Sequence, residues 1–406
     1  MQNKILKYCV VFIIFFNTSI DIKSAITKEQ YTQPWFNIIP LAEILENNSQ
    51  VTYQKLVDKI YFDYPKFSIA PDFPNKGYFE DLFVLFIPQG KVQGICGYVF
   101  INEKLPDEFV RANRYDCLQW IQKKSGENVF KIPGKVAVIS QHGAARYFGL
   151  SANYYHTLCE VFARLALLEM HNIEYDRLYV PTTEKFMLEA LELWGIDVSK
   201  VVSPVDDDFC LQAEELIVPS LVINTSVGHK HSGNFQHPTT LKYMREKLLV
   251  GAQKKGVDIS KFSKRVFITR KDALNNPRHI VNEDEIFEMF EKKGFKRYSL
   301  CNLSVAEQIM LFHNAEIVVS EQGSGLTNIL FCQPNTKVIE IFQHLVDNCF
   351  WWVSNVFQLQ YIPITTIQID FNSFANWWDK GPGFIGSCHK SAYVPLDEIK
   401  KCVEGI

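Results

Sequence analysis

The feature that most constrains the fold of this chain is a regular alternation of apolar and helix-like segments between residues 265 and 357. The apolar segments predict strands at 265–269, 295–300, 317–320 and 337–342. The other segments predict helices at 282–293, 304–314, 326–332 and 345–357. Strands that alternate with helices form a parallel sheet covered on both faces. Ligands of such sheets bind outside the carboxyl ends of the strands, so we expect the functional site there.

A second alternation precedes this one and predicts another α/β domain. Its strands are expected at 136–140, 177–180, 196–203 and 216–220, and its helices at 153–172 and 182–194. Residues 26–135 show no such rhythm and are expected to be irregular, and the polar stretch 224–238 reads as a linker. We therefore predict domains at 26–225 and 226–365 around a central cleft, and a tail at 366–406 that packs back on the N-terminal domain.

The composition excludes several classes of protein. The 406 residues are 47% hydrophobic and 21% charged, which is ordinary globular usage. Lys and Arg number 42 against 45 Asp and Glu, and a nearly neutral chain has no global reason to bind nucleic acid or acidic membranes. Ten cysteines occur without a Cys-x-x-Cys pair, so we expect mostly buried thiols and no zinc ribbon.

The first 25 residues resemble a secretory signal segment. Two lysines precede an apolar run at 9–16, and the small residues Ser24 and Ala25 follow. The run is far shorter than the ~20 residues of a membrane-spanning helix. We expect residues 1–25 to direct the chain into the secretory pathway or to associate it with a membrane. The alternative is an ordinary hydrophobic N-terminus.

The first candidate site is the stretch SEQGSGLTN at 320–328, where a predicted strand turns into a helix. Gly323 and Gly325 allow a ligand to approach the backbone closely. The free N–H groups and the positive dipole end of the following helix suit a diphosphate. The stretch matches neither a P-loop nor the G-x-G-x-x-G fingerprint, so a tight turn without a ligand is the alternative.

The second candidate site is Arg270, at the carboxyl end of the first strand of the C-terminal domain, followed by Arg278, Asn282 and Glu283. The guanidinium of Arg270 can contact two phosphate oxygens at once. The alternative is a solvated loop of mixed charge. Two anion-suited features at neighbouring strand ends are less expected by chance than either alone.

The third candidate site is a helix face. His156, Glu160 and Arg164 are spaced four residues apart and would stack on one face of the predicted helix, with Asn153 one turn earlier. A histidine supported by a carboxylate can act as a general base. The alternative is an exposed polar stripe.

Three other polar clusters are weaker candidates. Asp206–Asp208 resembles an acidic metal-binding triplet but reads more simply as a solvated loop. His229, His231 and His237 have no Cys or carboxylate close by in the sequence, which favours loop histidines over a metal site. Gln141–Gly143 follows a predicted strand and could border the cleft.

Together, the candidate sites resemble the motifs of glycosyltransferase family 61, which includes bacterial polysaccharide-associated proteins, plant xylan-decorating transferases and animal protein O-GlcNAc transferases. The resemblance covers roughly residues 136–365. The matching motifs are Asn153-Tyr-Tyr-His156 with Glu160 and Arg164, Asp176–Pro181, Phe267–Ala273 with Arg278 and Asn282–Glu283, Leu303–Gln308, Gly323–Asn328 and Val338–Glu340. Their shared order and spacing carry the resemblance.

The resemblance implies a GT-B architecture, in which two Rossmann-like domains face a central cleft. It implies a nucleotide-sugar donor, expected to be a UDP-sugar, in the C-terminal domain and a glycan or glycoprotein acceptor on the side of the N-terminal domain. It also implies inversion at the anomeric carbon without an essential metal or cofactor. His156 is the expected base, oriented by Glu160, and Glu321 is the second candidate.

The resemblance also assigns the remaining candidates to the donor or the acceptor. The expected donor-binding residues are Arg270, Arg278, Asn282, Glu283, Gly323, Ser324, Gly325, Asn328 and Glu340. Glu340 would accept ribose hydroxyls, and Asn153 and Arg164 are expected on the acceptor side or in the cleft.

Two departures from the family pattern are Gln322, where the family usually has His, and Thr157, where it usually has Trp. These departures motivate one alternative function, a GT-B-like carbohydrate-binding or scaffold protein without turnover. A metal-dependent transferase that uses Asp206–Asp208 is another.

Overall fold

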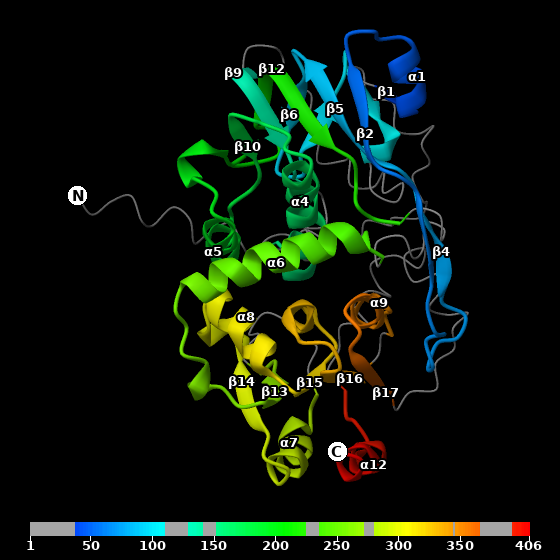
Figure 1. The fold of residues 1–406 in the computed structure, drawn as a ribbon, viewed down its shortest axis with the longest axis vertical. Coiled ribbons are helices and arrows are strands. Elements are labelled where there is room, and N and C mark those ends of the chain that lie inside the picture. Colours follow the sequence, from blue (N-terminus) through cyan, green and yellow to red (C-terminus); the bar gives the residue numbers. More distant parts are fainter. Residues whose placement is uncertain are drawn as a thin grey trace, which may run out of the picture.

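The computed structural model describes residues 37–109, 129–140, 152–224, 235–271, 280–343, 346–365 and 392–406. Within these ranges an N-terminal and a C-terminal half, each built on its own sheet, lie one above the other along the long axis of the molecule (Figure 1). No helix in this part of the chain has the length and apolar character needed to cross a membrane. Most of the described cysteines are buried thiols, which confirms the expectation; they are Cys96, Cys159, Cys210, Cys332 and Cys349.

The C-terminal half is the α/β domain that the alternation predicted. Its strands are all parallel, in the order β14 (Lys296–Ser299), β13 (Arg265–Thr269), β15 (Ile317–Glu321), β16 (Lys337–Phe342) and β17 (Gln360–Thr365). Counted along the chain this order is 2-1-3-4-5, that of a doubly wound sheet. The strand order reverses between β13 and β15, and ligands of such sheets bind at this switch point.

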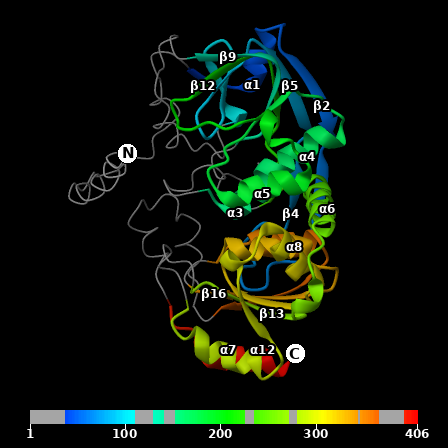
Figure 2. The ribbon, with the colours of Figure 1, turned by 90° about the vertical axis from the view of Figure 1, so that its left-hand side faces the viewer.

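Helices cover both faces of this sheet, which explains why its strands are apolar on both sides. The helices α8 (Val305–Asn314), η11 (Ser324–Phe331, a 3₁₀ helix) and α9 (Cys349–Val356) lie between the sheet and the N-terminal half. The helices α7 (Glu283–Glu291) and α12 (Leu396–Glu404) lie on the opposite face (Figures 1 and 2). Alternate residues of β13 therefore enter different cores: Val266 packs on the side of α8 and Phe267 on the side of α7.

Local signals explain where these helices begin and end. Ser304 and Glu307 form a capping box at the start of α8. Gly294, at φ +83°, follows the end of α7. Asn282 stands at the N-cap position of α7, but its side chain caps no N–H group of α7 among the described residues. The reason is that the amide of Asn282 is bonded to the backbone of Val394.

The N-terminal half is built on a mixed sheet. Its order is β11 (Val201–Val202), β10 (Arg177–Tyr179), β9 (Val129–Val138), β12 (Cys210–Pro219), β5 (Leu82–Pro88) and β2 (Thr52–Val57), with β6 (Lys91–Gln93) on β12 and β7 (Tyr98–Phe100) on β6. The first four strands are parallel, whereas β5 and β2 run antiparallel to their neighbours. The α/β class with parallel sheets is confirmed, and the GT-B arrangement remains a prediction.

The expectation that residues 26–135 are irregular is wrong for those that the structure describes. Besides β2, β5, β6 and β7, they contain β1 (Asn37–Ile39), α1 (Leu41–Glu46), β3 (Ile60–Asp63), β4 (Lys76–Phe79) and β8 (Lys104–Pro106). Four of the six residues of β2 are exposed, so this strand has no apolar run that a sequence pattern could reveal.

A helix that the sequence analysis did not predict joins the two halves. The helix α6 (Pro238–Lys254) crosses the middle of the molecule (Figure 1). It packs against α4 (Ala163–Met170) and α5 (Lys185–Trp194) of the N-terminal half and against α8 of the C-terminal half. One apolar core consequently extends through both halves. The proposed domain boundary at residue 225 lies outside the described residues.

Residues 392–406, the described part of the C-terminal tail, pack on the C-terminal half and not on the N-terminal domain as we expected. Ala392 forms a β-bridge with Ile280, and α12 packs against α7. The buried face of α12 consists of Ile399 and Val403. A stripe this short is compatible with many apolar partners, so only the fold decides which one it covers.

Candidate active site

The carboxyl ends of β13 and β15 bring together the two anion-suited features that the sequence indicated. Arg270 follows β13 and donates from Nη1 to the carbonyl oxygen of Gln322 at 2.8 Å. Gly323 lies against the same guanidinium, because a Cβ added to Gly323 would stand 1.5 Å from Arg270 Nη1. The backbone of Gly323 is extended, at φ 166°, so glycine is needed here for space and not for conformation. This pair lies at the switch point of the sheet.

Glu321 holds Arg270 in place. Its Oε1 lies 3.6 Å from Arg270 Nε, and its Oε2 accepts the backbone N–H of Ile280 at 3.1 Å and the side-chain amide of Gln343. The side chain of Glu321 is only 1% exposed. A buried carboxylate beside a guanidinium balances its charge and fixes its orientation. This geometry describes a positioning residue, and the role of Glu321 as a second base stays a prediction.

Two other residues expected to bind the donor hold neighbouring backbone segments. The buried carboxylate of Glu283 accepts the hydroxyl of Thr269, the last residue of β13, at 2.8 and 3.0 Å. The amide of Asn282 accepts the N–H of Val394 at 2.9 Å and donates to its carbonyl oxygen at 2.8 Å. Arg278 lies outside the described residues.

The first turn of η11 offers backbone N–H groups beside Arg270. Ser324 and Gly325, both predicted to bind the donor, are partly exposed there. The first N–H groups of a helix have no partner within the helix, so they are suited to an anion.

Asn328 and Glu340 are fully buried and bonded within the protein. Asn328 Oδ1 accepts the hydroxyl of Tyr154 at 2.9 Å, and Glu340 accepts the hydroxyl of Tyr361. Both residues lie close to the carboxyl ends of the strands, where the sequence analysis placed the site, but neither is exposed at the surface of the site.

His156 and Glu160 form the pair that the helix spacing predicted. Nδ1 of His156 lies 2.6 Å from Glu160 Oε1, and the two side chains are 10% and 0% exposed. An ionised carboxylate only accepts hydrogen bonds, so this contact places a proton on Nδ1 and leaves Nε2 as the basic nitrogen. Asn153 accepts from two backbone N–H groups of α3 (Tyr154–His156), at 2.9 and 3.4 Å, and so fixes the turn that carries His156.

The helix predicted at 153–172 contains a π-helical turn, Thr157–Phe162, between α3 and α4. Turns of this kind are rare in proteins, and those that occur often lie at functional sites. Arg164 follows it and donates to the carbonyl oxygens of Pro219, at 2.6 and 3.2 Å, and of Ser140, at 2.6 Å. Burial lowers the pKa of Arg164 to about 9, and the nearby carboxylate of Glu160 opposes this effect. Arg164 thus connects the helix to the backbone at Ser140 and Pro219. Its role on the acceptor side stays a prediction.

Asp347 lies near the site and was missed in the sequence. It precedes α9 and accepts the backbone N–H of Cys349 at 3.0 Å. Burial raises the pKa of its carboxyl group, and the nearby His156 acts in the opposite direction. Asp347 follows β16 by a few residues, so a wider search beyond each strand end would have found it.

The weaker candidates have structural positions where the structure describes them. Asp206 accepts the backbone N–H groups of Asp208 and Phe209 at 2.9 and 2.8 Å and so closes a turn. Across the described ranges, no three His, Cys, Asp or Glu side chains come together as a metal site would require. His229, His231 and Gln141–Gly143 lie outside these ranges.

His237 is fully buried and packs edge-on against Phe79. Neither of its ring nitrogens has a hydrogen-bond partner among the described residues. Burial lowers the pKa of His237 to about 4, so the ring is neutral at physiological pH. His237 is therefore a buried core histidine at the N-cap of α6, and not a solvent-exposed loop histidine.

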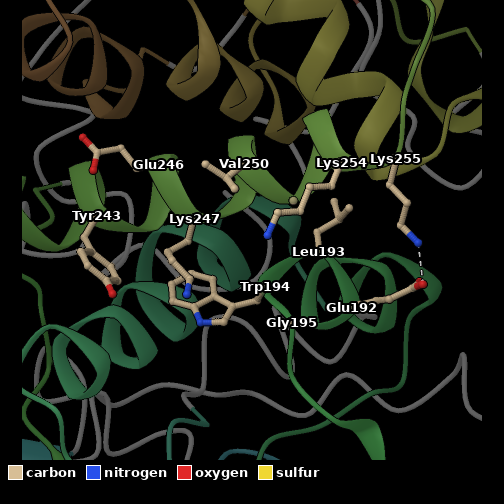
Figure 3. Close-up of a pocket in the computed structure, with 11 residues that line it drawn as sticks. Glu192, Leu193, Trp194, Gly195, Tyr243, Glu246, Lys247, Val250, Lys254 and Lys255 are labelled. Atoms are coloured by element: carbon tan, nitrogen blue, oxygen red, sulfur yellow. Dashed lines mark hydrogen bonds and ion pairs between the residues drawn. The ribbon is translucent and has the colours of Figure 1, made fainter.

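A separate pocket of about 570 Å³ lies between the end of α5 and α6 (Figure 3). Trp194 and Tyr243 line it, together with Lys247 and Lys255, each of which is paired with a glutamate. None of the motif residues lines this pocket, so it is distinct from the candidate active site.

The fold and the site define an α/β protein that has groups suited to bind an anion at the carboxyl ends of β13 and β15, and a buried His–Glu pair. Residues 154–339 match the family model described as Glycosyltransferase 61. The resemblance drawn from the motifs is thereby confirmed, and this part of the chain is similar to that family. The matched range begins in α3 and ends in β16, so it includes His156, Arg270 and Gly323.

Two plant proteins are similar to part of the chain. Beta-1,2-xylosyltransferase RCN11 of Oryza sativa subsp. japonica is 26% identical over 25% of this chain and 21% of its own length. Beta-1,2-xylosyltransferase of Arabidopsis thaliana is 28% identical over 19% of this chain and 18% of its own length. The chain thus matches about a fifth of the length of these curated relatives.

Proposed function

We propose that the protein is a glycosyltransferase that moves a sugar from a nucleotide-sugar donor to a hydroxyl group of a glycan or glycoprotein. The observation that carries this proposal is the contact of Arg270 with Gly323 at the switch point, beside the start of η11. A guanidinium and the N–H groups of a helix N-terminus suit a diphosphate. The family match and the names of the plant relatives support sugar transfer, with a pentosyl group such as xylosyl among the candidates.

The residues at hand suit an inverting reaction. His156 Nε2 would take the proton of the acceptor hydroxyl as its oxygen attacks the anomeric carbon. The bond from the anomeric carbon to the diphosphate oxygen would break in the same step. Glu160 would stabilise the resulting imidazolium, and Arg270 would stabilise the departing diphosphate.

We further propose a metal-independent reaction of a UDP-sugar in a GT-B arrangement. The positive charge of Arg270 and the dipole of η11 would supply the stabilisation that a divalent cation supplies elsewhere. The donor would bind the C-terminal half, and the acceptor would approach from the N-terminal half, which carries His156.

Gln322 favours a second candidate function, that of a carbohydrate-binding protein without turnover. This residue stands where the family usually has His, and its side-chain oxygen is buried without a partner among the described residues. An uncharged amide can donate a hydrogen bond to a phosphate but cannot transfer a proton.

One assay separates these functions. The purified chain is incubated with a panel of sugar nucleotides, with and without EDTA, and released nucleotide is measured. Release that persists in EDTA is expected. Saturable binding without release would support the binding protein, and release abolished both by EDTA and by Asp207→Ala would support a metal-dependent transferase.

Replacing the proposed base tests the mechanism. His156→Ala should lower the transfer rate by ~10²-fold or more, the usual scale for loss of a general base. His171→Ala, which removes an imidazole just after the end of α4, serves as the control and should leave the rate unchanged. A near-normal rate in His156→Ala would remove this residue from the mechanism.

We also propose that the protein enters the secretory pathway through residues 1–25, which lie outside the described residues. Fusion of this segment to a cytosolic reporter should direct the reporter into the endomembrane fraction. A reporter that stays in the cytosol would contradict the proposal.

A further inference from the structure

Three side chains form a hydrogen-bonded chain from the helix of His156 to the C-terminal half. The hydroxyl of Tyr154 donates to Asn328 Oδ1 at 2.9 Å, and Asn328 Nδ2 donates to Gln308 Oε1 at 3.0 Å. The amide of Gln308 donates in turn to two backbone carbonyls of the turn after β14, at 3.0 and 3.1 Å. The chain therefore connects α3, η11, α8 and the edge of the parallel sheet.

Asn328 is unsuited to bind the donor, although its place in the motif predicted that role. It is fully buried, and its second amide hydrogen bond goes to the carbonyl oxygen of Gly325 at 3.1 Å. Both its amide nitrogen and its carbonyl oxygen thus serve contacts within the protein. A donor sugar would have to break these contacts to reach it.

The hydroxyl of Tyr154 is well suited to donate its hydrogen bond to Asn328 at all times. Burial raises the pKa of its phenol, so the hydroxyl keeps its proton throughout the physiological range. Its ring packs edge-on against Phe186 of α5, with ring centroids 5.1 Å apart, which fixes the direction of the hydroxyl.

The three hydrogen-bonded side chains lie next to both parts of the candidate active site. Tyr154 lies two residues before His156 in α3, and Asn328 lies three residues after Gly325 in η11. The Tyr154–Asn328 bond therefore fixes the distance between the helix of the proposed base and the turn proposed to hold the diphosphate.

We infer that Tyr154, Asn328 and Gln308 form a latch that positions His156 relative to the donor. The inference rests on the proposed function, because it assigns these three residues to positioning the reacting groups and not to contact with the substrate. A displacement of about 1 Å between reacting groups can lower a rate by about 10²-fold.

The first test is Tyr154→Phe, which removes the hydroxyl and keeps the ring. The kcat of transfer should fall by about 10-fold or more, while the KM for the sugar nucleotide stays within about 2-fold, because the donor turn itself is intact. Tyr243→Phe is the matched control, since its hydroxyl bonds Glu169 outside the latch; its kcat should not change. An unchanged kcat in Tyr154→Phe would overturn the positioning role.

The second test does not depend on activity. Tyr154→Phe, Asn328→Ala and the double variant are compared by urea unfolding. If the two residues are bonded, the shifts of the unfolding midpoint are not additive, and the double variant resembles the more affected single variant. Additive shifts would overturn the latch even in an active enzyme. If the shifts are non-additive but the protein releases no nucleotide from any donor, the proposed function is refuted, whereas the hydrogen-bonded contact between Tyr154 and Asn328 is confirmed.

Discussion

At the scale of single residues, the candidate active site depends on side chains that are held by the backbone. Arg270 is bonded to a backbone carbonyl, Glu321 accepts a backbone N–H, and Asn153 caps the turn of His156. Arg270 and His156 keep partial exposure, with side chains 13% and 10% accessible. They combine a charge or a basic nitrogen with access to a ligand, which is what phosphate binding and proton transfer require.

The lack of space for a side chain at Gly323 predicts the effect of a substitution on donor binding. Gly323→Ala places a Cβ 1.5 Å from Arg270 Nη1, so the guanidinium must move. The affinity for the sugar nucleotide should fall by about 10-fold or more, the effect of about 1.4 kcal/mol, while the fold persists. Isothermal titration measures the affinity. Gly405→Ala, whose new Cβ would meet no atom closer than 3.6 Å, is the control and should bind normally.

The buried His237 predicts how stability depends on pH. Its pKa of about 4 in the folded protein lies below the ordinary value of 6.5, so folding favours the neutral ring. The stability is fully present above pH 6.5 and falls as the pH drops from 6.5 to 4, because only the unfolded state takes up a proton there; the loss reaches about 3 kcal/mol near pH 4. Urea unfolding at several pH values measures it.

The matched variant for this prediction is His237→Leu, which cannot titrate. The free energy of unfolding of this variant should lose less between pH 6.5 and 4 than that of the parent. Equal losses in both proteins would mean that other groups cause the acid sensitivity.

At the scale of elements, one helix and one tail show how the site is supported. The π-helical turn separates α3, which carries His156, from α4, whose first turn carries Arg164. Residues 392–406 of the tail, which the sequence analysis assigned to the other domain, hold the segment at 280–282 through Asn282. Ile280 in the same segment donates to Glu321, so the tail reaches the site through two hydrogen-bonded steps.

The bond between Asn282 and the tail predicts a loss of stability. Asn282→Ala leaves the N–H and the carbonyl of the buried Val394 without their partner. The free energy of unfolding should fall by roughly 1–3 kcal/mol, the usual cost of an unsatisfied buried polar group. Asn302→Ala, at an exposed position, is the control and should change it little. Equal stability of the two variants would show that the tail is not held by Asn282.

The elements of the C-terminal half were largely predictable from the sequence, because their signals are local. The strands at 265–269 and 337–342 have the predicted bounds, and the helix predicted at 304–314 is α8, with Ser304 as its N-cap. The helix α6 was missed because its buried positions, such as Leu241 and Leu248, alternate with many charged residues. The short strands of the N-terminal half were missed because exposed faces interrupt their apolar pattern.

At the scale of the whole molecule, the two halves share one core. Phe67, in the segment that joins β3 to β4, packs against Phe342 and Trp351 of the C-terminal half. Glu189 of α5 accepts the first N–H of α8 at 2.8 Å. Arg245 of α6 donates to two carbonyl oxygens at the end of η11, at 2.7 and 3.0 Å. An interface this apolar and this well bonded opposes independent motion of the halves.

The shared core predicts that the halves unfold together. Far-UV circular dichroism and tryptophan fluorescence should report the same midpoint in a urea titration, because one apolar cluster contains residues of both halves. Two separate transitions would show that the halves are independent domains. Arg245→Met, which removes the bonds to η11, should lower the common midpoint without splitting the transition.

The sequence by itself determined which residues could carry the chemistry, because motif residues, strand ends and helix spacing are properties of the chain order. It identified Arg270, Gly323, His156 and Glu160, and the structure brings the members of each pair into contact. Only the tertiary structure decided which candidates remain available to a ligand. Asn328, Asn282 and Glu283 are bonded to residues at least 14 positions away. Burial and long-range hydrogen bonds depend on which segments the fold places side by side, and no local pattern contains that information.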